Sequence, residues 1–207
     1  MTTAEIEARL GQLVHEGEGD SGCIRRAAEL AGVIYAGVTR DQGTPYVEHP
    51  IAVTRILFDE IGMREARLLA VALLHDALEI RPHSGQAIAD RLGDDTVEAL
   101  RAMTPDYRLE SRVRRPEDDA AYRAKVRALP DQLLAVRLAD RVHNLRELPA
   151  STNPDRHRRF LDQLAELYMP LADERGRSSP PIRGLRMLLE ADITRAGPVA
   201  GERSQGV

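Results

Sequence analysis

Leu73-Leu74-His75-Asp76-Ala77-Leu78-Glu79 is the stretch that decides how the rest of the chain must be arranged. The apolar run from Leu68 to Leu74 predicts a buried helix, and the end of that helix carries one imidazole and two carboxylates. Such groups cost several kcal/mol when they are buried without partners. Residues three and four apart share a helix face, so His75, Asp76 and Glu79 can point into one cavity. We therefore expect hydrogen bonds, counter-charges or a divalent metal ion at this place.

The composition favours an all-α fold. Aromatic residues make up 3% of the 207 residues and Trp is absent, whereas the helix-favouring Ala, Leu, Arg and Glu are abundant. A chain of this length suits one core, so we expect a single domain over residues 1–195 and a flexible tail over 196–207. The apolar periodicity predicts a bundle of roughly eight to ten helices with the polar cluster in its core.

Charge and cysteine content disfavour several classes of protein. Lys and Arg number 29 and Asp and Glu number 33, and the net charge of −4 is spread over interspersed residues, which speaks against nucleic-acid binding. Cys23 is the single cysteine, so no disulfide can form within the chain. We find neither an apolar run long enough for a membrane span nor a secretion signal. We expect a cytoplasmic protein with a small-molecule partner and no membrane partner, and the sequence indicates no particular oligomeric state.

Two segments outside the opening stretch supply further polar groups. Pro50 suits the first turn of a helix, so His49 is expected at the start of a helix that runs to about Ile61. A largely apolar helix is expected after Pro130, and it places Asp140 and Asn144 four residues apart on one face.

The remaining segments predict the rest of the bundle. The central helix is expected over about 64–78, and residues 104–116, with few apolar anchors, suggest a mobile loop. A long helix is expected over about 154–175, with a kink at Pro170.

Four side chains are candidate metal ligands, two imidazoles and two carboxylates: His49, His75, Asp76 and Asp140. This donor set suits a divalent ion with open coordination positions, such as Mn²⁺, Fe²⁺ or Zn²⁺, better than a structural zinc site built from thiolates. Water bound at an open position loses a proton more readily and supplies a nucleophile near neutral pH.

Other polar side chains could assist a hydrolysis. Glu79 can orient or deprotonate the attacking water, and Asn144 can hold that water or a substrate oxygen. His143 is expected to support the site rather than to bind the metal. Guanidinium groups can bind phosphate oxygens, although an arginine in a buried helix is as often part of a structural ion pair; the candidates are Arg40, Arg137, Arg141 and Arg146. The set predicts hydrolysis of a phosphate ester or pyrophosphate.

The order of these motifs resembles the hydrolase domain of the RelA/SpoT alarmone enzymes, a branch of the HD superfamily. The resemblance rests on four motifs in order: Arg40 with Gly43-Thr44-Pro45-Tyr46, then His49-Pro50, then Leu74-His75-Asp76 with Glu79, then Leu138 to Asn144. The segment from Tyr168 to Gly176 is similar to the end of that domain. Few residues follow Gly176, so the stand-alone, hydrolase-only form is expected.

The resemblance implies a fold, a reaction and a set of roles. The family is an all-α bundle that binds Mn²⁺, with Fe²⁺, Co²⁺ and Zn²⁺ as possible substitutes. It removes the 3′-pyrophosphate of guanosine tetra- and pentaphosphate to give GDP or GTP. By motif, the four candidate ligands keep their role, Glu79 and Asn144 position or activate the water, and Arg40 and Tyr46 lie at the nucleotide.

Departures from the family pattern leave two alternatives open. Ile80 follows Glu79 where the family usually has a second carboxylate, and Asp41 follows Arg40 where it usually has a cation. Tyr35 and Val38 replace a His and a Gln. One alternative is the same metal chemistry on another nucleotide, such as an adenosine alarmone or NADPH. The other is a catalytically weak nucleotide-sensing module.

Overall fold

The computed structural model of the chain describes residues 2–11, 21–148 and 154–196, and over these residues the fold is helical. The α-helices are α1 (Thr3–Leu10), α3 (Ser21–Ile34), α4 (Glu48–Arg55), α5 (Ala66–Leu73), α6 (Ala77–Ile80), α7 (Gly85–Leu92), α8 (Asp94–Met103), α9 (Asp106–Leu109), α10 (Glu117–Arg127), α11 (Asp131–Glu147), α12 (Pro154–Gln163), α13 (Met169–Arg175) and α14 (Pro180–Ala196). The all-α prediction is confirmed. Apart from residue 196, the tail expected over 196–207 lies outside the described residues.

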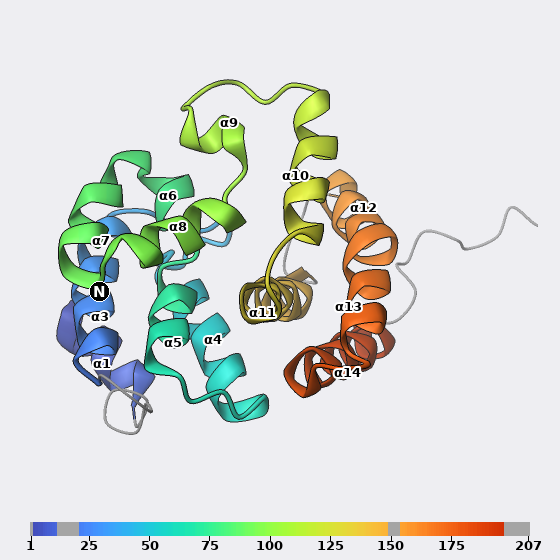
Figure 1. Cartoon of the computed structure of the whole chain (residues 1–207), viewed down its shortest axis with the longest axis horizontal. Helices are drawn as coiled ribbons and strands as arrows, with labels where there is room; N and C mark the ends of the chain where they lie inside the picture. Colours follow the sequence, from blue (N-terminus) through green and yellow to red (C-terminus); the bar gives the residue numbers. More distant parts are fainter. Residues whose placement is uncertain (1, 12–20, 149–153, 197–207) are drawn as a thin grey trace, which may run out of the picture.

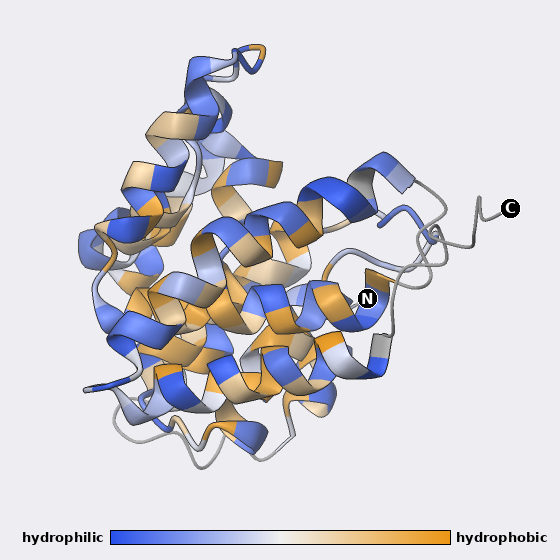
Figure 2. Ribbon diagram, turned by 90° about the vertical axis from the view of Figure 1, so that its right-hand side faces the viewer, coloured by the Kyte–Doolittle hydropathy of each residue, from blue (hydrophilic) through white to orange (hydrophobic). Residues whose placement is uncertain are grey.

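Helix α11 lies at the centre of the molecule. Leu134, Val136, Leu138 and Val142 are all buried although they point from different sides of this helix, so it must be enclosed by several others. It packs most extensively against α14 and α4. Figure 1 views α11 almost end-on, with α1 to α8 on one side of it and α10 and α12 to α14 on the other. Figure 2 shows the apolar residues gathered where the helices face one another.

The central helix ends earlier than the sequence predicted. Helix α5 stops at Leu73, a turn occupies residues 74–76, and the short helix α6 starts at Ala77. In a continuous helix the Ala72 carbonyl would accept from the backbone N–H of residue 76, but here it accepts from the backbone N–H of His75 at 3.4 Å and from Nδ1 of the same residue at 2.8 Å. The prediction of one helix over 64–78 was therefore wrong, and His75 and Asp76 stand at a bend.

Other helix limits agree with the sequence more closely. His49 and Pro50 lie in the first turn of α4, which continues through a π-helical turn at Ile56–Glu60. The break expected in the late helix is a second π-helical turn, Leu164–Tyr168, just before Pro170. The connection 104–116, expected to lack structure, contains α9. Among the described residues, every helix is too short or too polar to traverse a bilayer.

Candidate active site

The four side chains predicted as metal ligands meet in the core. They come from the first turn of α4, from the bend between α5 and α6, and from α11, and each is at most 7% exposed. Nε2 of His49 is 3.2 Å from Oδ1 of Asp140 and 3.5 Å from Oδ2 of Asp76. Nε2 of His75 is 3.2 Å from Oδ2 of Asp76 and 4.0 Å from Oδ1 of Asp140. Ligand atoms of His49, His75 and Asp76 therefore lie within 4.8 Å of one another, and Oδ1 of Asp140 lies beside both imidazoles.

The protonation of His75 shows why a cation fits this cluster. The Ala72 carbonyl can only accept, so Nδ1 of His75 carries a proton. Burial alone would lower the pKa of His75, but the charge of Asp76 raises it, so Nε2 faces a strongly negative environment. That Nε2 is buried and has no hydrogen-bond partner. Two buried carboxylates around this nitrogen require a positive charge between them, which either a proton on Nε2 or a metal cation supplies. Nitrogen and oxygen donors in equal number suit a borderline divalent ion.

Neighbouring groups fix the two carboxylates. The Tyr46 hydroxyl donates to Oδ2 of Asp76 at 2.8 Å, and Nη2 of Arg141 donates to Oδ2 of Asp140 at 2.6 Å. Nη2 of Arg137 lies 3.4 Å from the same Asp140 oxygen. Burial alone would raise the pKa of the Asp140 carboxyl, but the charges of Arg141 and Arg137 hold that pKa well below its usual range. Asp140 is therefore ionised at neutral pH.

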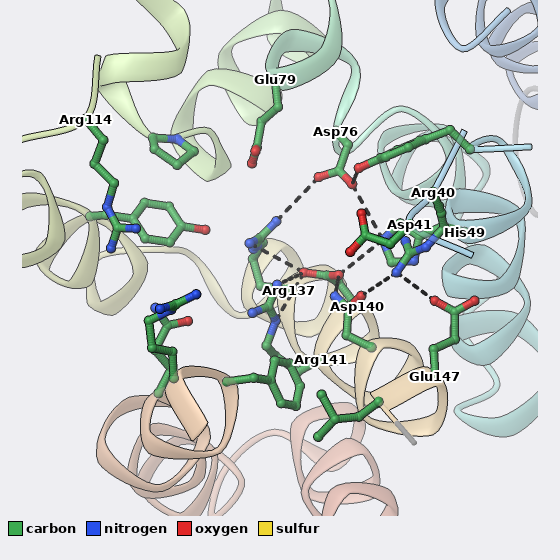
Figure 3. Close-up of a pocket in the computed structure, with 18 of the residues that line it drawn as sticks. Arg40, Asp41, His49, Asp76, Glu79, Arg114, Arg137, Asp140, Arg141 and Glu147 are labelled. Carbon is green, nitrogen blue, oxygen red and sulfur yellow. Dashed lines mark hydrogen bonds and ion pairs between the residues drawn. The ribbon is translucent and has the colours of Figure 1, made fainter. Parts of the chain in front are cut away.

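Glu79 is placed for proton transfer. It extends from α6 into the pocket, as Figure 3 shows, and it lines the space next to Asp76. Burial and, after it, the charge of Asp76 together raise the pKa of the Glu79 carboxyl to about 7. A group with such a pKa can accept or give a proton near neutral pH. Ile80, the next residue, packs against the hydrophobic core and does not line the pocket.

Asn144 connects Asp140 to the loop that precedes α4. Its Nδ2 donates to Oδ1 of Asp140, and its Oδ1 accepts a hydrogen bond from Nη2 of Arg40 at 3.0 Å. The same Nη2 of Arg40 is 2.6 Å from Oε2 of Glu147. Sequence reasoning missed Glu147, although its place one turn after Asn144 puts it on the same face of α11.

His143 contacts the His49 ring on the side away from the carboxylates. Its Nδ1 lies 2.9 Å from Nδ1 of His49, so it steadies the ring whose Nε2 faces the carboxylates. Burial lowers the pKa of His143 to about 3, and the charges of His49 and Arg40 contribute to this shift. The ring is thus neutral at pH 7. His49, His143 and Glu147 also form a group whose ligand atoms lie close together.

Arg146 is the one predicted substrate residue that the described structure keeps away from the pocket. Its Nε donates to Oδ2 of Asp192 at 2.7 Å, and its Nη1 donates to Oε1 of Glu60 at 2.6 Å. It does not line the pocket. Two residues beyond Asn144, it lies on another face of α11 and ties this helix to α14 and to the turn after α4.

The pocket itself has a volume of about 410 Å³, which suits a small organic ligand. The loop Thr39–Gln42 forms one side, α11 forms the floor with Asp140 and Asn144, and residues of α10 and α12 form the opposite side. Figure 3 shows the charged groups that surround this space. The sequence-predicted Arg40, Tyr46, Arg137 and Arg141 all line it.

Known proteins resemble this chain over most of its length. Residues 27–177 match the family model described as HD domain. The chain is 33% identical over 155 residues to the bifunctional (p)ppGpp synthase/hydrolase SpoT of Escherichia coli (strain K12). It is 31% identical over 149 residues to a guanosine-3′,5′-bis(diphosphate) 3′-pyrophosphohydrolase of Haemophilus influenzae. These alignments cover 74% and 71% of this chain, and the chain spans 22% of the length of each relative.

A solved structure has the same fold. It is described as a metazoan ortholog of SpoT that hydrolyzes ppGpp, and it matches with a TM-score of 0.62. The match covers 85% of this chain and 94% of that chain at 24% sequence identity. The likeness supports the helical architecture described above.

Proposed function

This chain belongs to the HD domain family, and from that premise we propose that it is a metal-dependent pyrophosphohydrolase that removes the 3′-pyrophosphate of guanosine 3′,5′-bispyrophosphate. The tetraphosphate gives GDP and pyrophosphate, and the corresponding pentaphosphate gives GTP and pyrophosphate. The observation that carries the proposal is the buried, unpartnered Nε2 of His75 facing two carboxylates. The names of the relatives in Escherichia coli and Haemophilus influenzae support the choice of substrate.

In this proposal His49, His75, Asp76 and Asp140 hold the ion. Mn²⁺ is our first choice, and Fe²⁺, Co²⁺ and Zn²⁺ suit the same donors. A divalent ion bound there makes water more acidic and withdraws charge from a phosphoryl oxygen. Arg137 and Arg141 act on the carboxylates, which they keep ionised and oriented.

The remaining residues of the site serve the hydrolysis directly. Glu79 accepts a proton from the attacking water, as its pKa of about 7 allows. The water oxygen forms a bond to the phosphorus next to the 3′ oxygen, and the bond between that phosphorus and the 3′ oxygen breaks. The 3′ oxygen takes up the proton that Glu79 accepted and leaves as a hydroxyl. Asn144 and Arg40, which are hydrogen-bonded to each other, form the wall against which the nucleotide lies.

The test is pyrophosphate release by purified protein that has been stripped of metal and then given Mn²⁺ and guanosine tetraphosphate. We expect release that depends on the metal and that falls by roughly a hundredfold or more in Asp76→Ala. Asp95→Ala, an exposed change on α8, is the control and keeps its activity. Nucleotide binding without release under Mn²⁺, Fe²⁺, Co²⁺ or Zn²⁺ would instead identify a sensing module.

A further inference from the structure

The pocket has two unlike ends. The loop end consists of Thr39–Gln42 and Glu147, and the α12 end contains Arg114 and Arg159. Figure 3 shows Glu147 on one side of Asp140 and Arg114 on the other side. A nucleotide whose 3′ phosphates lie at the candidate metal ligands must extend towards these ends with its base and its 5′ phosphates.

Arg40 and Glu147 form an ion pair at the loop end. Nη2 of Arg40 lies 2.6 Å from Oε2 of Glu147, and the Arg40 side chain is 10% exposed. A phosphate that binds Arg40 would have to displace this carboxylate or lie beside it, and two like charges so close together disfavour binding. The loop end therefore suits an uncharged part of the nucleotide, which is the base.

The α12 end suits the charged part. Asp118 accepts two hydrogen bonds from Arg112 at 2.7 Å and Asp119 pairs with Arg114, so a guanidinium neutralises each of these carboxylates. Arg159 is exposed and has no ionic partner within the part of the chain that the structure describes. The 5′ phosphates of a bis(diphosphate) can extend towards this positive charge, which leaves the base for the loop end.

The loop end also offers flat surfaces. The ring of Tyr46 lines the pocket, and Cζ of Arg40 lies 5.9 Å from the centroid of that ring. Leu148, the residue after Glu147, lines the pocket as well. Nucleobases stack in proteins on aromatic rings and on guanidinium planes. A base can therefore lie against this end while its edge reaches Glu147.

The carboxylate of Glu147 can distinguish one base from another. An ionised carboxylate only accepts hydrogen bonds, and it can accept from two adjacent N–H groups at once. Guanine presents N1–H and N2–H₂ side by side, next to the acceptor O6, whereas adenine presents the single donor group N6–H₂ beside the acceptor N1. Among the described residues, the ion-pair contacts of Glu147 with Arg40 and with His143 at 3.6 Å both use Oε2. Oε1 is therefore available to a base.

We infer that Glu147 selects guanine as the base of the nucleotide. Its carboxylate accepts from N1–H and N2–H₂ of the base, and the neighbouring Arg40 donates to O6. The inference rests on the proposed function, which places the 3′ phosphates at the metal ligands, and it names the residue that makes the substrate a guanosine nucleotide.

The experiment compares guanosine 3′,5′-bis(diphosphate) with its inosine counterpart, which lacks only the N2 amino group, under Mn²⁺. We expect kcat/KM to be roughly tenfold or more higher for the guanosine nucleotide. Glu147→Gln should bring this ratio close to one, because a carboxamide offers a single acceptor, which N1–H of either base can use. Glu98→Gln, the same exchange at an exposed position of α8 outside the pocket, should leave the ratio intact.

Two results would overturn the inference. One is an equal kcat/KM of the unmodified protein for both nucleotides. The other is a Glu147→Gln variant that loses activity on both nucleotides by the same factor, which would show that Glu147 acts only by holding Arg40. If neither nucleotide is cleaved, the proposed function has failed, and calorimetry with the same two nucleotides decides the inference. Equal affinities, or no binding of either nucleotide, would then contradict it.

Discussion

At the scale of single residues, the hydrogen bond between Tyr46 and Asp76 gives Tyr46 a second role beside lining the pocket. The sequence placed Tyr46 at the nucleotide, and it does line the pocket, but its hydroxyl also donates to the Asp76 oxygen that faces both imidazoles. Burial and the charge of Asp76 raise the pKa of this hydroxyl far above its usual range, so it stays a donor. Tyr46 therefore orients a candidate metal ligand.

Tyr46→Phe is expected to weaken metal binding by roughly ten- to hundredfold, since hydrogen bonds to charged groups contribute about 1.5–3 kcal/mol and a phenyl ring keeps the packing. Isothermal calorimetry with Mn²⁺ measures this. The matched control is Tyr35→Phe, because Tyr35 stacks on Tyr46 at 5.6 Å but donates to the Leu73 carbonyl instead of to a ligand. Equal losses in the two variants would show that Tyr46 acts through packing alone.

Glu79 gives the metal-stripped protein a pH-dependent stability. Its pKa is about 7 in the folded chain against an ordinary value of 4.5, so the folded state holds the proton more tightly than the unfolded state. Its contribution is most favourable below the unfolded pKa and is lost as pH rises through the folded pKa. Near pH 8 the free energy of unfolding, measured by urea denaturation, should therefore be higher for Glu79→Gln than for the unmodified protein, by up to about 3 kcal/mol. This difference should shrink towards pH 5. A difference in unfolding free energy that does not change with pH would contradict the raised pKa of Glu79.

Residue patterns could predict which candidate ligands lie together but not all of their neighbours. His49, His75, Asp76 and Asp140 each stand in a short motif whose residue types already indicate metal chemistry. The partners of Arg40 and Arg146 depend instead on residues that lie far away in the chain, namely Glu147, Glu60 and Asp192. Nothing local in the sequence specifies such pairs, so the contacts by which Arg146 joins helices could not be predicted from the sequence.

At the scale of elements, the bend between α5 and α6 lay beyond sequence reasoning. Apolar periodicity reports which side of a helix is buried, and it continues through residues 74–78 without interruption. Where the helix ends, both the backbone N–H and the imidazole of His75 bind the Ala72 carbonyl, and such a local contact has no periodic signal. In the loop 104–116 the sequence predicted too little structure. Its polar composition gave no sign of α9 or of the ion pair between Arg112 and Asp118.

Asp118 is the anchor of that loop. It accepts two hydrogen bonds from Arg112 and one from the Arg115 backbone N–H at 2.6 Å, and the Arg112 and Arg115 bonds lower its pKa to about 2. Asp118→Asn should accelerate amide exchange over residues 110–117 by several-fold, as seen by mass spectrometry. Asp119→Asn, which removes only the exposed partner of Arg114, should change exchange much less. Equal acceleration of amide exchange in both variants would show that Asp118 does not hold this loop.

At the scale of the whole molecule, α11 joins two groups of helices, and Arg146 secures both contacts. It binds Glu60 after α4 with two hydrogen bonds and Asp192 on α14 with one. Asp192 is 7% exposed, so loss of Arg146 leaves a buried carboxylate with Arg195 as its remaining partner.

Arg146→Met should lower the free energy of unfolding by about 2–4 kcal/mol, because it breaks a partly buried ion pair. Urea denaturation gives the value. Since Arg146 does not line the pocket, KM for nucleotide and the affinity for Mn²⁺ should stay unchanged in the folded variant. A raised KM with an unchanged free energy of unfolding would instead indicate that Arg146 binds the substrate.

The bundle as a whole followed from composition and periodicity, because burying apolar helix faces leaves few arrangements for a chain of this size. The angles at which the helices cross could not be predicted from the sequence, since they depend on how side chains pack across α11.

The four candidate ligands stand at positions 49, 75, 76 and 140, so their atoms meet only after the chain has closed loops spanning most of the described fold. An ion that binds the folded state alone must then raise its population by mass action, by about 1.4 kcal/mol for each tenfold excess over the dissociation constant. The melting temperature should climb with the logarithm of free metal concentration. The cellular lifetime of this protein would thereby be linked to metal supply, independently of any nucleotide.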